Sequence, residues 1–144
     1  MLTYGIILLT ECWLQNEAEL SVSGYVVRLL PRKKPRCTQG GGIAVLIREE
    51  ICHFVSICEV CEDTVLWLKI SSVNNEDTYI CCFYIPPSCS SYYLLYDCDL
   101  FSDIEQQVSK YSGLGRIFLV GDSNARTGDK NDFISLVIIP CITL

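Results

Sequence analysis

The chain has 144 residues, of which 50% are hydrophobic and 19% are charged, and this composition suits one globular domain with a substantial core. The formal net charge of −6 argues mildly against a protein that grips a nucleic-acid backbone over a broad basic face. The apolar patch at residues 6–9 has no basic residue before it and is too short to span a membrane. We therefore expect an intracellular protein, nuclear or cytoplasmic, that is not secreted and has no membrane partner.

In chain order, the sequence predicts a series of short strands, because runs rich in β-branched and aromatic residues alternate with turn residues. These strands are residues 5–10, 25–30, 42–48, 53–57, 64–70, 78–85 and 116–121. The polar segment at residues 74–77 is typical of a hairpin connection between two of them. We expect Trp67 to lie in the core.

One helix is predicted between the last two strands. Its apolar stripe follows spacings of three and four residues and consists of Leu94, Cys98, Phe101, Ile104, Val108 and Tyr111. Gly113 and Gly115 are expected to end it. A strand, a helix and a strand in this order form a crossover, so the two flanking strands can be parallel neighbours. This arrangement would bring Tyr84 and Asp122 to the same edge of a sheet.

Polar groups stand at the ends of three predicted strands. Glu11 follows the first strand, Tyr84 precedes Pro86, and Asp122 and Asn124 follow the last strand. In an extended chain, residues i and i+2 point to the same side, and α/β sheets tend to bind ligands at the carboxyl ends of their strands. A carboxylate can hold a hard cation or orient water, and an amide can bind a phosphate oxygen. We interpret the pattern as metal-assisted phosphate chemistry; the alternative is an ordinary turn.

Four motifs follow one another along the chain: TECWL at residues 10–14, GGGIAVL at 40–46, YIPP at 84–87 and GDSNARTG at 121–128. Their order and spacing resemble the endonuclease/exonuclease/phosphatase superfamily, and most closely the endonuclease domains of non-LTR (LINE-type) retrotransposons. In that group the motifs look like TETWL, GGGVAVL, YIPP and GDFNARTG, so Cys12 and Ser123 are departures. The likeness divides the chain into a partial domain, residues 1–133, and a divergent or truncated tail, residues 134–144.

The resemblance implies an α/β (α+β) fold, an incomplete two-sheet sandwich with helices outside and the site at one end between the sheets. It implies metal-dependent phosphodiester hydrolysis with DNA as the ancestral substrate. Glu11 would be the ligand of Mg²⁺ or Mn²⁺, weakly held. Asp122 would orient or deprotonate the attacking water, Asn124 would bind a phosphate oxygen, and Tyr84 would help to stabilise the transition state.

The family also uses an Asn on its first strand and a carboxyl-terminal Asp–His pair, and the chain offers no match to either. We therefore expect this chain, by itself, to be a poor or inactive nuclease, since loss of one member of a catalytic unit is very costly. An incomplete sheet would also expose an edge through which the chain can self-associate. A small-molecule phosphoesterase of the same superfamily and a non-catalytic binding remnant are the alternatives.

The chain contains ten cysteines, and we expect free thiols in a reducing compartment. Cys58 and Cys61 form a Cys-x-x-Cys pair, which together with Cys52 and His53 is the residue set of a zinc site. The simpler interpretation, which we favour, is a strand end and turn with incidental thiols, and His53 as a strand residue.

The basic cluster at residues 32–36, Arg-Lys-Lys-Pro-Arg, also allows two interpretations. Flanking prolines and the following glycines favour a solvated loop. A loop that contacts phosphate beside the site is the functional alternative.

Overall fold

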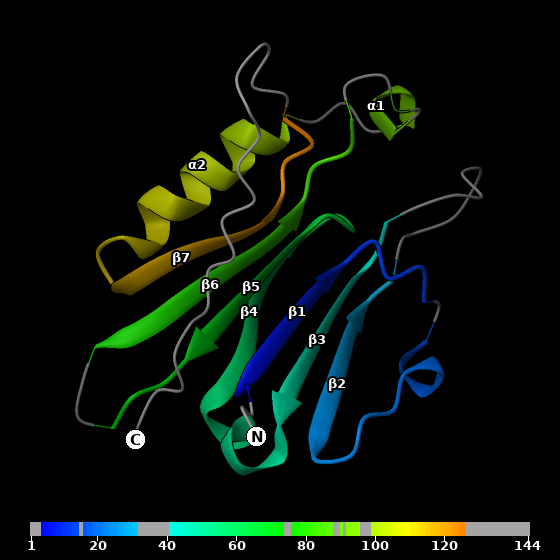
Figure 1. Ribbon diagram of the computed structural model, residues 1–144. Helices are drawn as coiled ribbons and strands as arrows, with labels where there is room; N and C mark the ends of the chain where they lie inside the picture. Colours follow the sequence, from blue (N-terminus) through cyan, green and yellow to red (C-terminus); the bar gives the residue numbers. More distant parts are fainter. Residues whose placement is uncertain are drawn as a thin grey trace.

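The computed structural model describes residues 4–14, 16–31, 41–73, 76–87, 90, 92–95 and 99–125. Figure 1 shows its elements in chain order. The strands are β1 (Ile6–Thr10), β2 (Tyr25–Leu30), β3 (Ile43–Arg48), β4 (Val55–Cys61), β5 (Val65–Ile70), β6 (Asp77–Tyr84) and β7 (Gly115–Asp122). The helices are η1 (Glu17–Glu19), η2 (Glu49–Phe54), α1 (Tyr92–Leu95) and α2 (Leu100–Tyr111).

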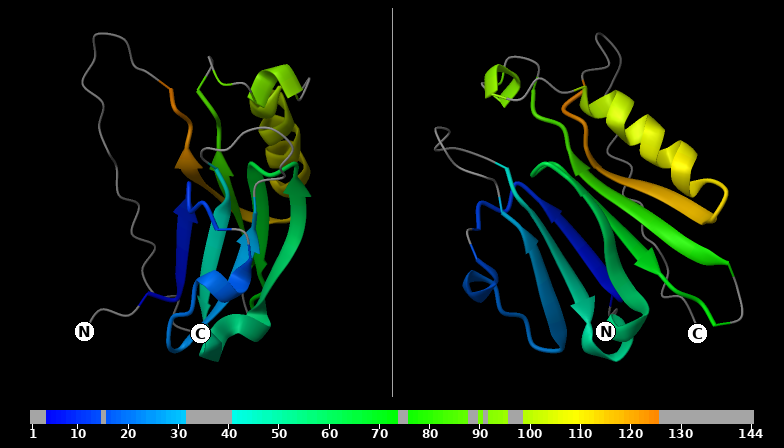
Figure 2. Two further views of the ribbon diagram at one scale, coloured as in Figure 1. Left: turned by 90° about the vertical axis from the view of Figure 1, so that its right-hand side faces the viewer. Right: turned by 180° about the vertical axis from the view of Figure 1, so that it is seen from behind.

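The strands form two sheets. The smaller sheet has the order β1-β3-β2 and is antiparallel. The larger sheet has the order β4-β5-β6-β7; its last pair, β6 and β7, is parallel and the others are antiparallel. The sheets stack face to face, and α2 covers the outer face of the larger one (Figure 2). The expectation of a mixed α and β protein with two sheets is therefore confirmed.

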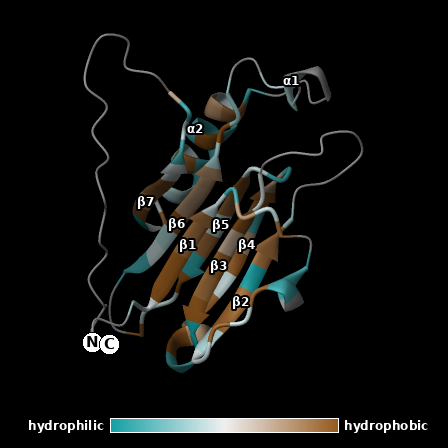
Figure 3. Ribbon diagram, turned by 45° about the vertical axis from the view of Figure 1, so that its right-hand side comes forward, coloured by the Kyte–Doolittle hydropathy of each residue, from teal (hydrophilic) through white to brown (hydrophobic). Residues whose placement is uncertain are grey.

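Strand β5 shows why the sheets stack in this way. Its side chains alternate between two apolar surfaces, as a period of two residues requires. Val65 and Trp67 belong to the core beneath α2, whereas Leu66 and Leu68 belong to the core between the sheets. Both cores lie along strands that are apolar over most of their length (Figure 3). A strand that is buried on both faces typically has a continuous run of apolar residues, and β5 begins with such a run, Val65 to Leu68.

Most strand predictions are confirmed within one residue at either end, but the region around β4 is not. Residues 49–54 form the 3-10 helix η2, so the prediction of His53 as a strand residue was wrong. Cys58 lies inside β4, so the prediction of a strand end and turn was wrong for this residue, whereas Cys61 ends the strand as predicted. The turn is made by the next residues, where Glu62 has a φ of 49° and the amide of Thr64 donates to the carbonyl of Cys61 (3.4 Å).

The predicted helix is divided into α1 and α2. The carboxylate of Asp99 accepts a hydrogen bond from the amide of Ser102 (3.2 Å) and so caps the start of α2. Because the helix begins there, Leu100 is buried and Phe101 is 60% exposed, which contradicts the predicted place of Phe101 on the apolar stripe. Ile104 and Tyr111 are buried as predicted. No helix in the described ranges is long and apolar enough to cross a membrane.

The prediction that matters most for the site is the crossover through α2, and it is confirmed. Strands β6 and β7 are parallel, and their register pairs Tyr84 with Asp122 directly. Several other predictions concern residues outside the described ranges: the basic cluster at 32–36, Asn74 and Asn75, Cys98, and the chain from residue 126 onward.

Candidate functional site

The ends of β6 and β7 form one side of the site. Cys82 and Val120, two residues before Tyr84 and Asp122, belong to the core between the sheets. By strand alternation, Tyr84 and Asp122 share that face and point toward the smaller sheet. The amide of Ile85 donates to the carbonyl of Asp122 (2.8 Å), so pairing continues one residue past the end of β6.

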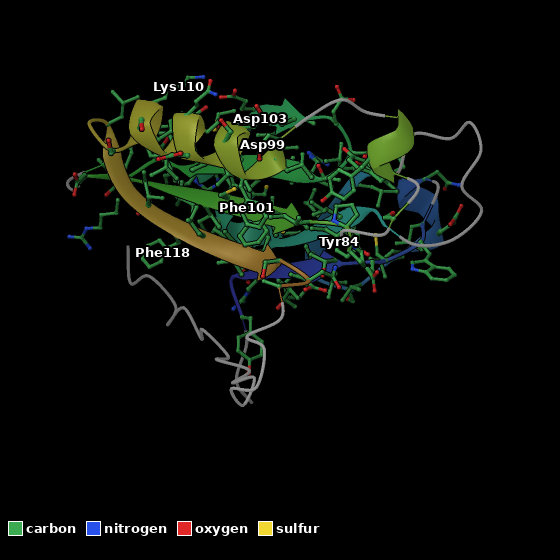
Figure 4. The ribbon with its side chains drawn as sticks, turned by 90° about the horizontal axis from the view of Figure 1, so that it is seen from above. Tyr84, Asp99, Phe101, Asp103, Lys110 and Phe118 are labelled. Carbon is green, nitrogen blue, oxygen red and sulfur yellow. The ribbon has the colours of Figure 1, made fainter. Side chains whose placement is uncertain are left out.

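The end of β1, in the other sheet, supplies Glu11. The hydroxyl of Tyr84 donates a hydrogen bond to its carboxylate, which joins the two sheets at this end. Figure 4 shows Tyr84 where the ribbons of β1, β6 and β7 come together. Tyr84 is only 6% exposed, whereas Glu11 and Asp122 are exposed to solvent. The phenol thus forms the floor of the site, and the two carboxylates lie at its open side.

Asn124 completes the cluster through two hydrogen bonds. Its amide nitrogen in the backbone donates to the carboxylate of Asp122 (2.8 Å), and its side-chain Nδ2 donates to the carbonyl of Ile85 (2.9 Å). Asn124 has a φ of 47°, a left-handed conformation that asparagine adopts more readily than most residues. A side-chain amide carries two N–H groups, and the side chain of Asn124 also makes a hydrogen bond with Tyr84.

The electrostatic environment of Tyr84 depends on all of these neighbours. Burial and the hydrogen bond to Glu11 raise the pKa of Tyr84 to about 12, and the charge of Asp122 acts in the same direction. The side chain of Asn124 opposes this and lowers the pKa of Tyr84. The phenol is therefore a protonated donor throughout the physiological pH range. Because all three polar neighbours act on this one hydroxyl, the four predicted site residues lie close together.

The glycine motif before β3 supports the turn that carries Glu11. The amides of Cys12 and Trp13 donate to the carbonyls of Gly42 (3.4 Å) and Gly41 (3.2 Å). Gly42 has a φ of 88°, and a Cβ there would lie 3.3 Å from the sulfur of Cys12. Glu11 itself has a φ of 52°, which is uncommon for a residue of this type. The sequence motif contained the glycines, but their role beneath Glu11 emerged only from the structure.

The donor set suits a hard cation. Glu11 and Asp122 supply carboxylate oxygens, and Mg²⁺ is commonly held in proteins by one or two carboxylates together with water. Within the described residues, no three or more His, Cys, Asp or Glu side chains gather as a metal-binding group. This finding covers the residues of the alternative zinc site; the thiols of Cys58 and Cys61 instead contact the carbonyl of Trp67 (3.5 Å) and the carboxylate of Asp103 (3.7 Å).

His53, the single histidine of the chain, is remote from the cluster. It lies in η2, directly after the end of β3 that pairs with the start of β1. Glu11 follows the other end of β1, beside the start of β3. The cluster therefore has no imidazole from this chain.

The continuation of the last motif, Arg126, Thr127 and Gly128, lies outside the described residues. The chain matches no protein-family model, and it has no significant match among curated proteins.

Proposed function

We propose that Glu11, Tyr84, Asp122 and Asn124 form the phosphate-handling site of a metal-dependent phosphodiesterase. The single observation that carries this proposal is the hydrogen bond from Tyr84 to Glu11, because it joins two distant motifs in one cluster. Two exposed carboxylates beside a buried phenol and an amide can hold a cation, a water molecule and a phosphate oxygen at one place.

We further propose that the fold is an incomplete form of the endonuclease/exonuclease/phosphatase sandwich and that the substrate is DNA. The two stacked sheets and the position of the cluster at one end between them support this assignment. The order of the four sequence motifs favours a retrotransposon-type endonuclease over the small-molecule phosphoesterase. The net charge of −6 is the observation that favours the small substrate instead.

The proposed roles follow from the chemistry of each group. When bound beside Glu11, Mg²⁺ or Mn²⁺ would supply positive charge that stabilises the phosphoryl oxygens. Asp122 orients a water molecule and accepts its proton as that water attacks phosphorus. The side-chain amide of Asn124 donates an N–H to a phosphate oxygen. Tyr84 stays protonated, and once Glu11 binds the cation its single O–H turns to the phosphate and stabilises the negative charge that develops in the transition state.

We propose that hydrolysis is slow. The leaving alkoxide must be protonated or otherwise stabilised, and His53 cannot do this from the far end of β1 and β3. Loss of one positioned acid or base typically lowers the rate by about 10²- to 10⁴-fold. A residual rate would depend on the cation, the phenol and the amide.

Nicking of supercoiled plasmid DNA in the presence of Mg²⁺ or Mn²⁺ tests this function. We expect slow, metal-dependent nicking that Glu11→Gln and Asp122→Asn abolish. The matched control is Glu105→Gln, on the exposed side of α2, which should leave nicking unchanged. Hydrolysis of bis(p-nitrophenyl) phosphate with no nicking would favour the small-molecule phosphoesterase. Absence of both reactions would overturn the proposed enzyme and leave a binding remnant.

A further inference from the structure

Trp13 is an exposed aromatic residue directly beside the candidate site. Its side chain is 59% exposed, whereas Trp67, the other tryptophan, is completely buried. Only Cys12 separates Trp13 from Glu11, so the Cα atoms of Trp13 and Glu11 are at most about 7 Å apart. Apolar surface that stays in water gives up the free energy that burial would contribute. The place of this indole at the edge of the proposed phosphate site therefore suggests a ligand that covers it.

The backbone holds Trp13 in a defined position. Its φ is 57°, and its amide donates to the carbonyl of Gly41 (3.2 Å). The same two glycines that support Glu11 thus support Trp13. A residue held in the left-handed region by surrounding structure is a feature that clusters at functional sites. The backbone of Trp13, and with it the direction of its Cα–Cβ bond, is therefore set by the fold.

Other exposed aromatic residues of the described chain lie elsewhere. Tyr4 precedes β1 at the opposite end from Glu11, Phe101 lies on α2, and Phe118 lies in the middle of β7. Figure 4 shows Phe118 well away from Tyr84 along β7. Trp13 alone among them follows the loop that carries a site carboxylate.

We propose that the indole of Trp13 is a stacking platform for an unpaired nucleobase whose neighbouring phosphate lies at the Glu11 cluster. This inference rests on the proposed function for the identity of that phosphate. A nucleobase has the flat π-face that an exposed indole recognises, and such stacking does not depend on a basic surface. Stacking is therefore compatible with both a nucleic-acid substrate and the net charge of −6. The substrate class that it names is single-stranded or locally unpaired DNA.

Binding measured without divalent cations tests the platform separately from hydrolysis. The probe is a fluorescein-labelled strand of ten thymidines, followed by anisotropy at low salt, with an abasic strand of equal length and phosphate number as the comparison. We expect the thymidine strand to bind more tightly than the abasic strand by on the order of 5- to 100-fold. Trp13→Ala should remove this difference, and Trp13→Phe should retain part of it. The matched control is Phe101→Ala, because Phe101 is equally exposed but lies on α2.

Intrinsic fluorescence provides a second measurement. Trp67 is buried and its Nε1 donates to Gln107 (2.6 Å), so quenching by the thymidine strand reports on Trp13. Equal binding of the two strands to the wild-type protein, or an unchanged preference in Trp13→Ala, would overturn the platform. Base-dependent binding in a protein that hydrolyses no phosphodiester would retain the platform and reject the enzyme.

Discussion

The hydroxyl of Tyr84 donates a hydrogen bond to the carboxylate of Glu11, although the two lie 73 positions apart in the chain. Tyr84 ends β6 in the larger sheet and Glu11 follows β1 in the smaller one, so this bond fixes the two sheets relative to each other where the site lies. It also gives the phenol a charged acceptor, which strengthens the hydrogen bond.

Tyr84→Phe should therefore lower activity far more than stability. The substitution keeps the buried ring and removes only the hydroxyl. We expect a loss of about 1 kcal/mol in the free energy of unfolding and a decrease of about 100-fold in the nicking rate. Urea denaturation and a plasmid assay measure the two effects. Tyr25→Phe is the matched control, because the hydroxyl of Tyr25 donates to the carbonyl of Tyr4 (2.7 Å), away from the cluster. Equal losses in the two variants would contradict a special role for Tyr84.

Gly121→Ala should disturb the site through the backbone. A Cβ at Gly121 would lie 2.0 Å from the carbonyl oxygen of Phe83 on the neighbouring strand, a distance that forces β6 and β7 apart. Because Asp122 is the next residue, its pairing with Tyr84 should be lost as well. We expect a destabilisation of about 1–3 kcal/mol in urea denaturation, together with loss of nicking. Gly113→Ala is the control, since a Cβ there meets nothing within 4 Å.

The sequence was sufficient to predict most of the strands and the parallel pair because both depend on local patterns. Apolar runs and turn residues identified most strand ends, and the strand–helix–strand order identified β6 and β7 as neighbours. From that pair, the meeting of Tyr84 and Asp122 followed directly. The proximity of Glu11 to Tyr84 was expected only from the likeness of the motifs. It depends on the stacking of the two sheets, which no local pattern specifies.

Other features could not be predicted because they depend on contacts between distant segments. The left-handed backbone of Glu11 requires the carbonyls of the glycine turn before β3. The exposure of Phe101 follows from the start of α2 at the Asp99 cap, which shifted the apolar stripe by one residue. The bulge in β4 between Ile57 and Glu59 accompanies hydrogen bonds from Lys110 (2.6 Å) and Tyr111 (2.7 Å) to Glu59 across to α2.

Thiol alkylation should distinguish the cysteines by their burial. Cys58 is exposed, whereas Cys81 and Cys82 are completely buried in the two cores. Burial raises the pKa of each buried thiol to about 12, so the reactive thiolate is scarce there at neutral pH. Iodoacetamide labelling followed by mass spectrometry should modify Cys58 in the native protein, and Cys81 and Cys82 only after denaturation. Rapid labelling of Cys81 in the native protein would contradict its packing beneath α2.

The same two thiols should make the protein less stable in alkali. Below pH 9 the thiols are protonated in both the folded and the unfolded state, so their ionisation does not lower the free energy of unfolding. Above pH 9 a thiol of the unfolded chain ionises, whereas burial keeps the pKa of Cys82 at about 12 in the folded state. The unfolded state then binds fewer protons, and the free energy of unfolding falls as pH rises from 9 toward 12. Urea denaturation at pH 7, 9 and 10.5 should show this decrease, and Cys82→Val should reduce its slope. An unchanged slope in Cys82→Val would contradict a contribution of this thiol to the loss of stability.

The outer edge of β7 should mediate self-association of the chain. Within the described strands, β7 pairs only with β6, so one row of its backbone groups faces outward. Phe118 and Leu119 are 36% and 49% exposed on its two faces, and an exposed apolar edge is a template for another strand.

We expect light scattering after size-exclusion chromatography to show oligomers that increase with concentration. Leu119→Lys should shift the population to monomer, because a charge at the edge opposes strand addition. Leu114→Lys changes a leucine that is 57% exposed in the turn before β7, and it should leave the distribution unchanged. A wild-type protein that stays monomeric at high concentration would contradict the role of this edge.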